Sequence, residues 1–236
     1  HLFNNWGSPN PNFNNNKLCP PYPECVPDGA VNYMDTSECW LNGDVNYDGS
    51  IDVIDVVALV NEILNPATFS WVLEDINPNS ELFGQMVGPD HSLFEEKVTG
   101  YYFGKAGCSM CRHRFGILND LQEELHVQGY KEVQFVGING LAYIDDAYDC
   151  MICYPEDTCS SCDGPRLVPW VQDIDGDGDT FGDVWKTWGA NLRDFVIIDR
   201  EGNFVTRISL TYYNPDPTSS CGESYDLIKQ TIIDLY

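Results

Sequence analysis

The chain has 236 residues, with 12 lysines and arginines against 37 aspartates and glutamates, and a formal net charge of −25. This charge argues against nucleic acids and anionic membranes as partners, because their phosphate-rich surfaces would repel the protein. Hydrophobic residues make up 43% of the chain and aromatic residues 13%, which argues against wholesale disorder and predicts a packed core.

The ten cysteines of the chain are the first indication of where the protein is located. An even cysteine count is typical of an oxidising compartment. No apolar run reaches the ~18 residues that a membrane-spanning helix needs. The chain begins at His1 and shows no signal peptide, as expected of a mature, processed protein; a trimmed polypeptide is the alternative. We therefore expect a secreted, extracytoplasmic protein, either extracellular or periplasmic, with the cell surface as a further location.

Residues 1–40 form a segment rich in asparagine, proline and cysteine, with no hydrophobic periodicity. The prolines exclude a helix or a central strand, and the composition is typical of disorder. Either of two interactions could order this segment: disulfides through Cys19, Cys25 and Cys39, or docking on a neighbouring molecule.

Residues 41–80 are expected to hold a small calcium-binding module and a linker. Within them, "GDVNYDGSIDVIDVVALVNEIL" (43–64) runs from a carboxylate-rich loop into an apolar helical pattern. Alternate residues turn their oxygens toward one point, and Gly49 permits the sharp turn between them. Oxygen ligands at this spacing suit Ca²⁺. The predicted ligands, Ser50 through its backbone carbonyl, are Asp44, Asn46, Asp48, Ser50, Asp52 and Asp55.

This loop resembles a dockerin-type calcium repeat, which has aspartate at its twelfth position where EF-hands usually have glutamate. The resemblance covers a single repeat, whereas dockerins carry two. A later stretch, "LEDINPNSELFG", starts with a similar Asp-x-Asn, but Pro78 interrupts it and the later carboxylates are missing. The resemblance therefore implies calcium binding without the cohesin binding of dockerins. A solvated acidic turn is the alternative interpretation.

From residue 81 to residue 236 the pattern predicts one α/β domain. The predicted elements are strands at 98–104, 133–138 and 167–172, a hairpin at 194–210, a helix that opens at the first close cysteine pair, and a closing amphipathic helix at 224–236. Four apolar residues lie on one face of the first helix at helical spacing: Phe115, Leu118, Leu121 and Leu125. Strand, helix, strand, then strand, hairpin and helix is an α/β plan.

Two cysteines, Cys108 and Cys111, lie where the first predicted strand gives way to the helix. A helix N-terminus stabilises a thiolate on the first of them. Nearby cations would do the same, and the candidates are Lys105, Arg112, His113 and Arg114. The pattern predicts Cys108 as the exposed nucleophile and Cys111 as the resolving partner. The alternative is an oxidised pair that only stabilises the fold.

The placement of this pair resembles the thioredoxin fold, and Val168–Pro169, just before a strand, is similar to the cis-proline that lies across from the dithiol in that fold. The stretches "VPWVQD" and "DVWKTWGANLRDFVIIDREGNFVTRISL" resemble the thioredoxin-like N-terminal domain of selenoprotein P and related bacterial redoxins, over about residues 95–236. This resemblance implies a central mixed sheet flanked by helices. It also implies that Cys108 holds the reactive position, that Cys111 resolves, and that Pro169 shapes the docking groove. The dithiol departs from that of thioredoxin in its two central residues.

Residues 148–166 are expected to form a cysteine-rich insertion with two close pairs: Cys150, Cys153, Cys159 and Cys162. In a reducing compartment, four thiolates at this spacing would suggest tetrahedral zinc. A secreted chain favours two disulfides, with zinc or a second redox pair as the alternatives. Cys221 would then pair with an N-terminal cysteine or with the insertion.

The stretch "QDIDGDGDTFGDVW" holds a second candidate calcium loop. Its alternating aspartates would bring their oxygens together, and five carboxylates so close would repel one another without a cation. Val184 stands at the twelfth position, so the cage would be non-standard, and a plain acidic loop is the alternative. The predicted ligands are Asp173, Asp175, Asp177, Asp179 and Asp183.

Two functions from different classes fit this sequence. One is a calcium-binding, extracytoplasmic thiol–disulfide oxidoreductase that acts on protein disulfides. The other is a non-catalytic extracellular structural protein that is stabilised by calcium and disulfides. Its N-terminal segment would bind an identical subunit, and repeated contacts of this kind would form fibres. An accessible Cys108 with a lowered pKa supports the first, whereas a buried Cys108–Cys111 disulfide supports the second.

Overall fold

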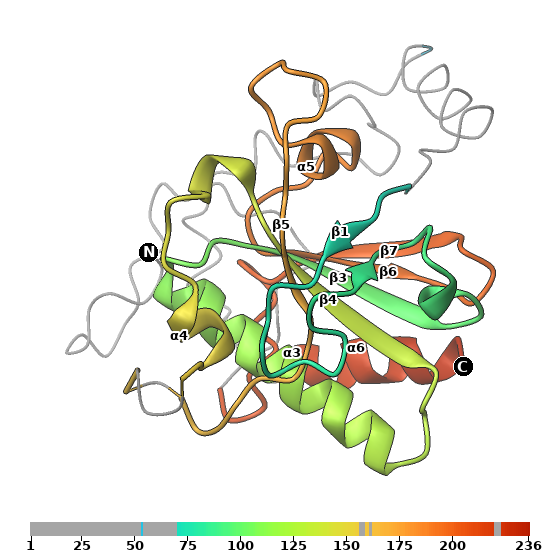
Figure 1. The fold of residues 1–236 in the computed structure, drawn as a ribbon. Coiled ribbons are helices and arrows are strands. Elements are labelled where there is room, and N and C mark those ends of the chain that lie inside the picture. Colours follow the sequence, from blue (N-terminus) through green and yellow to red (C-terminus); the bar gives the residue numbers. More distant parts are fainter. Residues whose placement is uncertain (1–52, 54–69, 156–158, 161, 220–222) are drawn as a thin grey trace. The chain divides into compact units, whose positions relative to one another are not determined.

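The computed structural model describes residues 53, 70–155, 159–160, 162–219 and 223–236 (Figure 1). The chain divides into two units, His1–Thr68 and Phe69–Tyr236, with the boundary inside the predicted module and linker. Three sequence predictions lie outside the described residues: the N-terminal segment 1–40, the ligands of the first calcium loop (Asp44, Asn46, Asp48, Ser50, Asp52 and Asp55), and the pairing of Cys19, Cys25, Cys39 and Cys221.

A five-stranded mixed sheet forms the centre of the second unit (Figure 1). Its strands are β3 (Val98–Gly104), β4 (Val133–Asn139), β5 (Trp170–Gln172), β6 (Asp194–Ile198) and β7 (Phe204–Ser209), in the order β5-β4-β3-β6-β7. The first three run parallel, whereas β6 is antiparallel to both β3 and β7. A parallel pair joined by a helix, followed by an antiparallel hairpin and a helix, is the thioredoxin-like plan that the sequence predicts.

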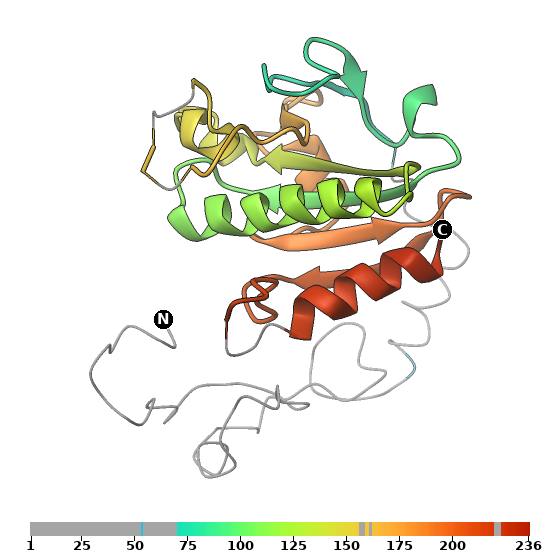
Figure 2. The same cartoon turned by 90° about the horizontal axis from the view of Figure 1, so that it is seen from below.

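Two long helices cover one face of the sheet: α3 (Ser109–Val127), which connects β3 to β4, and α6 (Glu223–Asp234), which follows the hairpin (Figure 2). The four apolar residues of the predicted helix face are all buried against the sheet, which gives α3 its orientation because apolar burial dominates packing energy. Among the described residues, no helix combines the length and the apolar character needed to cross a membrane.

Shorter elements cover the opposite face: the β1–β2 hairpin (Leu73–Glu74 and Met86–Val87), a 3₁₀ helix (Ser92–Phe94) and α5 (Asp183–Thr187). Successive residues of β3 alternate between the two faces, as the pleat of a strand requires. Tyr102 packs with α3, whereas Tyr101 and Phe103 pack against Trp188 at the end of α5. Two short helices, Leu141–Tyr143 and α4 (Asp149–Ile152), follow β4.

Gly137 in β4 lets the edge strand β5 and helix α3 pack closely together. A Cβ at this position would lie 2.2 Å from Cε3 of Trp170 and 2.6 Å from Cε2 of Phe115. Because only hydrogen occupies that space, the Trp170 indole lies over β4 and meets the Phe115 ring edge to face, with 5.0 Å between the ring centroids. This contact fixes α3 above the centre of the sheet.

Candidate functional site

The two cysteines lie at the start of α3, just past the end of β3. Cys108 has extended backbone angles (φ −94°, ψ 119°) and occupies the N-cap position of the helix. Its Sγ accepts a hydrogen bond from the backbone N–H of Cys111 at 3.3 Å, a role that serine or aspartate oxygens fill at most helix starts. A thiolate accepts such a bond more strongly than a thiol does, so this cap favours ionised Cys108.

The two sulfurs differ in their access to solvent. Cys108 is partly exposed and Cys111 is fully buried behind it, and both are free thiols in this structure. The backbone carbonyl of Cys111 accepts a hydrogen bond from Tyr102 Oη at 3.2 Å, which ties the first turn of α3 to β3. An accessible sulfur in front of a buried one is the arrangement that disulfide exchange requires, since the first can meet a substrate and the second can reach only the first.

Among the described residues, the cation that contacts the dithiol is Arg193, which immediately precedes β6. Its Nη1 lies 3.9 Å from the Sγ of Cys108 and 3.9 Å from the Sγ of Cys111. Burial alone would lower the pKa of Arg193, but its hydrogen bond to Cys111 and the attraction of both sulfurs leave that pKa raised. The guanidinium is therefore charged and shared between the two cysteines.

Two of the cations predicted to stabilise the thiolate point elsewhere. The Lys105 ammonium lies over the ring of Tyr143, 4.6 Å from its centroid. The Arg112 guanidinium donates to the backbone carbonyl of Ala106 at 3.3 Å. Both residues are close to Cys108 in sequence, but their charged groups bind these other partners instead of its sulfur.

The other two, His113 and Arg114, bind the segment that follows β7. His113 Nε2 lies 3.0 Å from a carboxylate oxygen of Asp216, and the Arg114 Nε donates to the backbone carbonyl of Leu210 at 3.1 Å. Arg114 also binds the side chain of Asn214. These contacts hold residues 210–216 against the first turns of α3, and the prediction that these cations stabilise the thiolate directly is wrong.

The pKa values of the two cysteines move in opposite directions. The hydrogen bond with Cys111 lowers the pKa of Cys108 to about 5, against the effect of burial and with help from the Cys111 N–H and Arg193. The same shared proton, together with burial, raises the pKa of the Cys111 thiol. The single proton of the pair therefore resides on Cys111, and Cys108 is the thiolate at neutral pH.

Pro169 does not occupy the predicted position across from the dithiol. Among the described residues the cis peptide bond is Tyr154–Pro155, so the bond before Pro169 is trans. Pro169 precedes the edge strand β5, and its carbonyl accepts a hydrogen bond from the Gly137 N–H of β4 at 2.9 Å. β5 lies beyond β4, whereas β6 lies directly beside β3. The residue that faces the sulfurs is therefore Arg193, which precedes β6. Sequence reasoning missed it, although the predicted hairpin at 194–210 marked the start of β6.

The second predicted calcium loop brings three of its five aspartates together. One carboxylate oxygen from each of Asp175, Asp177 and Asp183 lies within 4.8 Å of the others. Asp179 instead binds the Lys186 ammonium, which also lies 3.1 Å from a carboxylate oxygen of Asp177. Three carboxylates at this separation offer the oxygen ligands that hard divalent cations take.

Asp173 does not belong to this cluster, and its prediction as a metal ligand is wrong. Its side chain is fully buried. Its carboxylate accepts hydrogen bonds from the backbone N–H groups of Ile174 at 2.9 Å, Val184 at 3.1 Å and Trp185 at 3.1 Å. Burial raises the pKa of Asp173, although these bonds oppose the rise. The residue fixes the start of α5, because it satisfies N–H groups that a helix start leaves unpaired.

The cysteine-rich insertion contains two disulfides, as the sequence predicts. Cys150 pairs with Cys159 and Cys153 with Cys162, with Cα–Cα distances of 5.5 and 5.7 Å. Each bridge joins cysteines nine residues apart, so the two together tie α4 and the residue after it to Cys159 and Cys162.

Arg166 and Asn119 fasten this insertion to α3. The Arg166 guanidinium donates to the carbonyl of Met151 at 2.6 Å and lies against Gly116 of α3, where a Cβ would come within 2.9 Å of its Nη2. Asn119 Oδ1 accepts a hydrogen bond from the Leu167 N–H at 2.6 Å. Helix α4 and residues 166–167 therefore lie beside the amino-terminal half of α3, the half that carries the dithiol (Figures 1 and 2).

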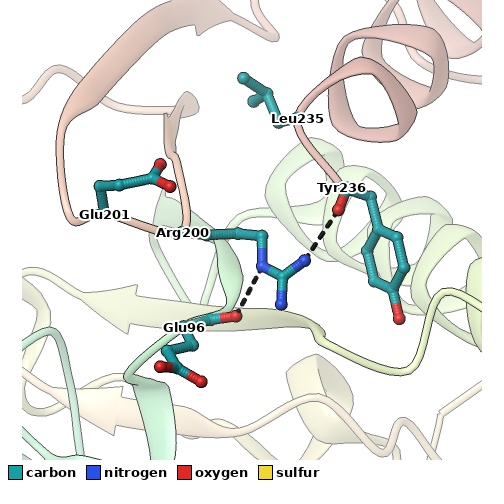
Figure 3. Close-up of a pocket in the computed structure, with 5 residues that line it drawn as sticks. All are labelled: Glu96, Arg200, Glu201, Leu235 and Tyr236. Carbon is teal, nitrogen blue, oxygen red and sulfur yellow. Dashed lines mark hydrogen bonds between the residues drawn. The ribbon is translucent and has the colours of Figure 1, made fainter.

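A shallow pocket at the opposite end of β6 is separate from the dithiol. It is lined by Glu96, Arg200, Glu201, Leu235 and Tyr236 (Figure 3). Arg200 donates to the backbone carbonyls of Glu96 at 3.0 Å and Tyr236 at 2.8 Å. These bonds tie the turn after β6 to the residues before β3 and after α6, so Arg200 serves the fold.

Comparison with known proteins finds similarity at the level of solved structures. No protein-family model matches the chain, and no curated protein matches it. Similar structures include DsbF of MTB in mixed oxidised and reduced forms, with 18% identity over 72% of this chain and 98% of that one, and a TM-score of 0.44. A secreted disulfide oxidoreductase from Mycobacterium tuberculosis, homologous to E. coli DsbE, shares 14% identity over 72% of this chain and 99% of that one, with a TM-score of 0.41. A thioredoxin-like protein from Aeropyrum pernix shares 17% identity over 76% and 99%, with a TM-score of 0.42.

Proposed function

We propose that this protein is a thiol–disulfide oxidoreductase in which Cys108 is the nucleophile and Cys111 the resolving cysteine. The observation that carries the proposal is the asymmetry of the pair: a partly exposed thiolate caps α3, and a buried, protonated thiol lies behind it. A lowered pKa and access to solvent are the properties that distinguish reactive cysteines from structural ones. The resemblance to selenoprotein P and bacterial redoxins assigns the same roles to the two residues.

The reaction consists of two exchange steps. The Cys108 thiolate attacks one sulfur of a protein disulfide, which breaks that disulfide, forms a mixed disulfide and releases the first substrate thiolate. Cys111 then loses its proton to water and attacks Cys108 Sγ, which forms the Cys108–Cys111 disulfide and releases the second substrate thiolate. The substrate gains two electrons, and a dithiol reductant of the same compartment returns the protein to its reduced form. The reverse sequence transfers the disulfide from Cys108–Cys111 to a substrate dithiol.

A purely structural role for the pair is the less favoured function. It would call for a buried Cys108–Cys111 disulfide, whereas Cys108 is partly exposed and both residues are free thiols. The pKa of Cys108, lowered to about 5, would have no role in an inert cross-link. The two disulfides of the insertion already supply a structural cross-link beside α3, and they support an oxidising, extracytoplasmic location.

The test is reduction of insulin disulfides by dithiothreitol in the presence of the protein. We expect the wild type to accelerate the reaction and Cys108→Ser to lose the acceleration, with Ser109→Ala, between the cysteines, as the matched control. Cys111→Ser should accumulate a covalent adduct with the substrate, visible by mass spectrometry and released by excess reductant. Equal rates for the wild type and Cys108→Ser would reject the function.

We further propose that the protein binds Ca²⁺ at two loops. The first is the dockerin-like loop from Asp44 to Asp55, on the strength of its ligand spacing. The second is the cluster of Asp175, Asp177 and Asp183, whose carboxylate oxygens are gathered closely enough to share one cation. Binding at either loop would relieve repulsion among carboxylates in a chain of net charge −25.

Calorimetry with EDTA-treated protein tests both sites by stoichiometry. We expect two bound Ca²⁺ for the wild type, and one for each of Asp48→Asn and Asp183→Asn. Asp145→Asn, an exposed aspartate outside both loops, is the control and should bind two. The melting temperature should rise with Ca²⁺, because a ligand that binds only the folded state stabilises it. An absence of both heat and stabilisation would remove the proposal.

A further inference from the structure

A single guanidinium lies at equal distance from the two sulfurs of the dithiol. Arg193 Nη1 is 3.9 Å from Cys108 Sγ and 3.9 Å from Cys111 Sγ. At this separation the contact acts mainly through charge, and charge interactions weaken only slowly with distance in a partly buried site. The guanidinium can therefore stabilise negative charge on either sulfur without moving.

The surrounding structure holds Arg193 in this place. Its Nε donates to Thr211 Oγ1 at 2.9 Å, and Thr211 in turn contacts the backbone carbonyl of Leu192. The Arg193 N–H donates to the carbonyl of Phe103 at 2.7 Å, and its own carbonyl accepts from the Leu210 N–H at 2.8 Å. Its φ is +72°, a left-handed conformation that arginine rarely adopts. Backbone of this kind is retained where the surrounding contacts impose it, and it gathers at functional sites.

We propose that Arg193 is a catalytic residue for both steps of the exchange, because it stabilises the thiolate of Cys108 before the substrate binds and the thiolate of Cys111 when the mixed disulfide is resolved. This inference rests on the function proposed above. The Arg193 guanidinium stays in place and stabilises first the Cys108 thiolate and then the Cys111 thiolate within one cycle.

The bond changes of the reaction explain why the negative charge that Arg193 faces moves from Cys108 to Cys111. When the Cys108 thiolate attacks the substrate disulfide, its charge leaves on the first substrate thiolate, and Arg193 no longer faces a negative sulfur. The Cys111 thiol then gives its proton to water, and the guanidinium favours the anion that remains. Cys111 Sγ bonds to Cys108 Sγ, and the electron pair of the broken bond leaves on the second substrate sulfur. The hydrogen bond from Cys111 to Cys108, which keeps Cys111 protonated in the resting state, is lost at the first step.

Other charged and titratable groups face the pair without contacting the sulfurs. Tyr102 from β3 donates to the backbone carbonyl of Cys111, and burial raises its pKa well above the ordinary value, so it stays neutral. Arg114 from α3 is attracted by a charge on Cys111 but directs its guanidinium to the segment after β7. Asp146 accepts a hydrogen bond from the N–H of Gly107, in the turn before Cys108, at 3.1 Å. None of these three can replace the guanidinium of Arg193.

Three substitutions separate charge from shape. Arg193→Met removes the charge and keeps much of the length, and Arg193→Lys keeps the charge but loses the planar fork. Arg193→Gly removes the side chain at a position where glycine relieves the backbone strain, so it protects the test against a failure to fold. Arg207→Met is the matched control, because Arg207 lies on the neighbouring strand β7 and binds the backbone carbonyls of Trp188 and Gly189.

Two measurements on the reduced protein report the ionisation of Cys108 and the rate at which Cys111 resolves the mixed disulfide. The pH dependence of Cys108 alkylation by iodoacetamide, read on the Cys108 peptide by mass spectrometry, gives the midpoint of its ionisation without any substrate. Stopped-flow reaction with 4,4′-dithiodipyridine, a neutral disulfide, releases one thiopyridone when Cys108 attacks and a second when Cys111 resolves. The signal of Cys108→Ser is subtracted as the background from other cysteines.

We expect the ionisation midpoint of Cys108 to rise by about 1–2 pH units in Arg193→Met and Arg193→Gly. The second thiopyridone phase should slow about tenfold in both, because each unit of rise in the Cys111 pKa removes about nine-tenths of its thiolate. Arg193→Lys should recover part of each effect, and Arg207→Met should match the wild type.

Unchanged midpoints and second phases in both Arg193→Met and Arg193→Gly would overturn the inference while leaving the oxidoreductase function intact. A shifted midpoint with an unchanged second phase would also overturn it, because it limits Arg193 to the first step. The failure of the proposed function is distinct: Cys108→Ser would then reduce insulin as fast as the wild type.

Discussion

Equilibration with glutathione buffers should place the reduction potential of the Cys108–Cys111 couple well above that of thioredoxin. A nucleophilic cysteine that holds its negative charge easily stabilises the dithiol form, and this makes the disulfide form more oxidising. A reactive-cysteine pKa of about 7 accompanies a potential of about −270 mV in thioredoxin, and a pKa of about 3.5 accompanies about −120 mV in DsbA. Linear interpolation to the Cys108 pKa of about 5 gives about −180 mV.

The assay is acid quenching at each glutathione ratio, followed by alkylation and mass spectrometry of the peptide that carries both cysteines. The Cys150–Cys159 disulfide is an internal control, since structural disulfides typically have potentials below about −300 mV and stay oxidised across this range. A measured potential at or below about −270 mV would refute the reasoning, because the lowered pKa of Cys108 would then not stabilise the reduced form.

Four further outcomes can be measured. Between pH 6.5 and 8 the alkylation rate of Cys108 should change by less than about twofold, because a thiol with a pKa of about 5 is already ionised there, whereas an ordinary thiol would gain about twentyfold. Asn119→Ala leaves one buried and one partly buried backbone N–H group unpaired and should lower the free energy of unfolding by about 2–4 kcal/mol in urea titrations, with a smaller loss for Asn119→Asp, which keeps the acceptor. Gly137→Ala should cost about 1–3 kcal/mol in the same titration, because its Cβ overlaps Trp170. Lys186→Met should raise the Ca²⁺ affinity of the second loop about two- to fivefold, since it removes the cation bound to Asp177; unchanged affinity would place the calcium elsewhere.

The sequence predicts the parts of this fold that depend on local patterns. The strand 98–104 coincides with β3, and the helix opens at the dithiol, because strand periodicity and helical spacing are properties of neighbouring residues. The two disulfides of the insertion follow from the cysteine composition, since closely spaced cysteines form disulfides in the oxidising compartment that the sequence predicts. In each case the information lies within a few residues of the element that it describes.

The misplaced residues share one cause, which is dependence on contacts in space that the order of residues along the chain does not determine. Pro169 precedes a strand, as a cis-proline across from the dithiol would, but sequence order does not state whether β5 or β6 lies beside β3. The four cations close to the dithiol in sequence were predicted to stabilise the thiolate, but closeness in sequence does not determine where a side chain points. Asp173 matched the alternating pattern of a calcium loop, and only the position of α5, which buries its carboxylate, separates it from Asp175.

The electrostatics of the dithiol therefore depend on the register of β6 against β3. In this register Tyr102 pairs with Phe195, and Arg193, two residues before Phe195, lies beside the end of β3, where its N–H donates to the carbonyl of Phe103. A slip of one residue would turn every side chain of β6 to the opposite face of the sheet, and the guanidinium would then point toward α5 instead of the sulfurs. The irregularity in the pairing of β6 with β7 lies between Ile197 and Ile198, at the end of the strand remote from the site. The bulge can absorb strain in the hairpin without moving Arg193, which among the described residues is the cation that contacts the cysteines.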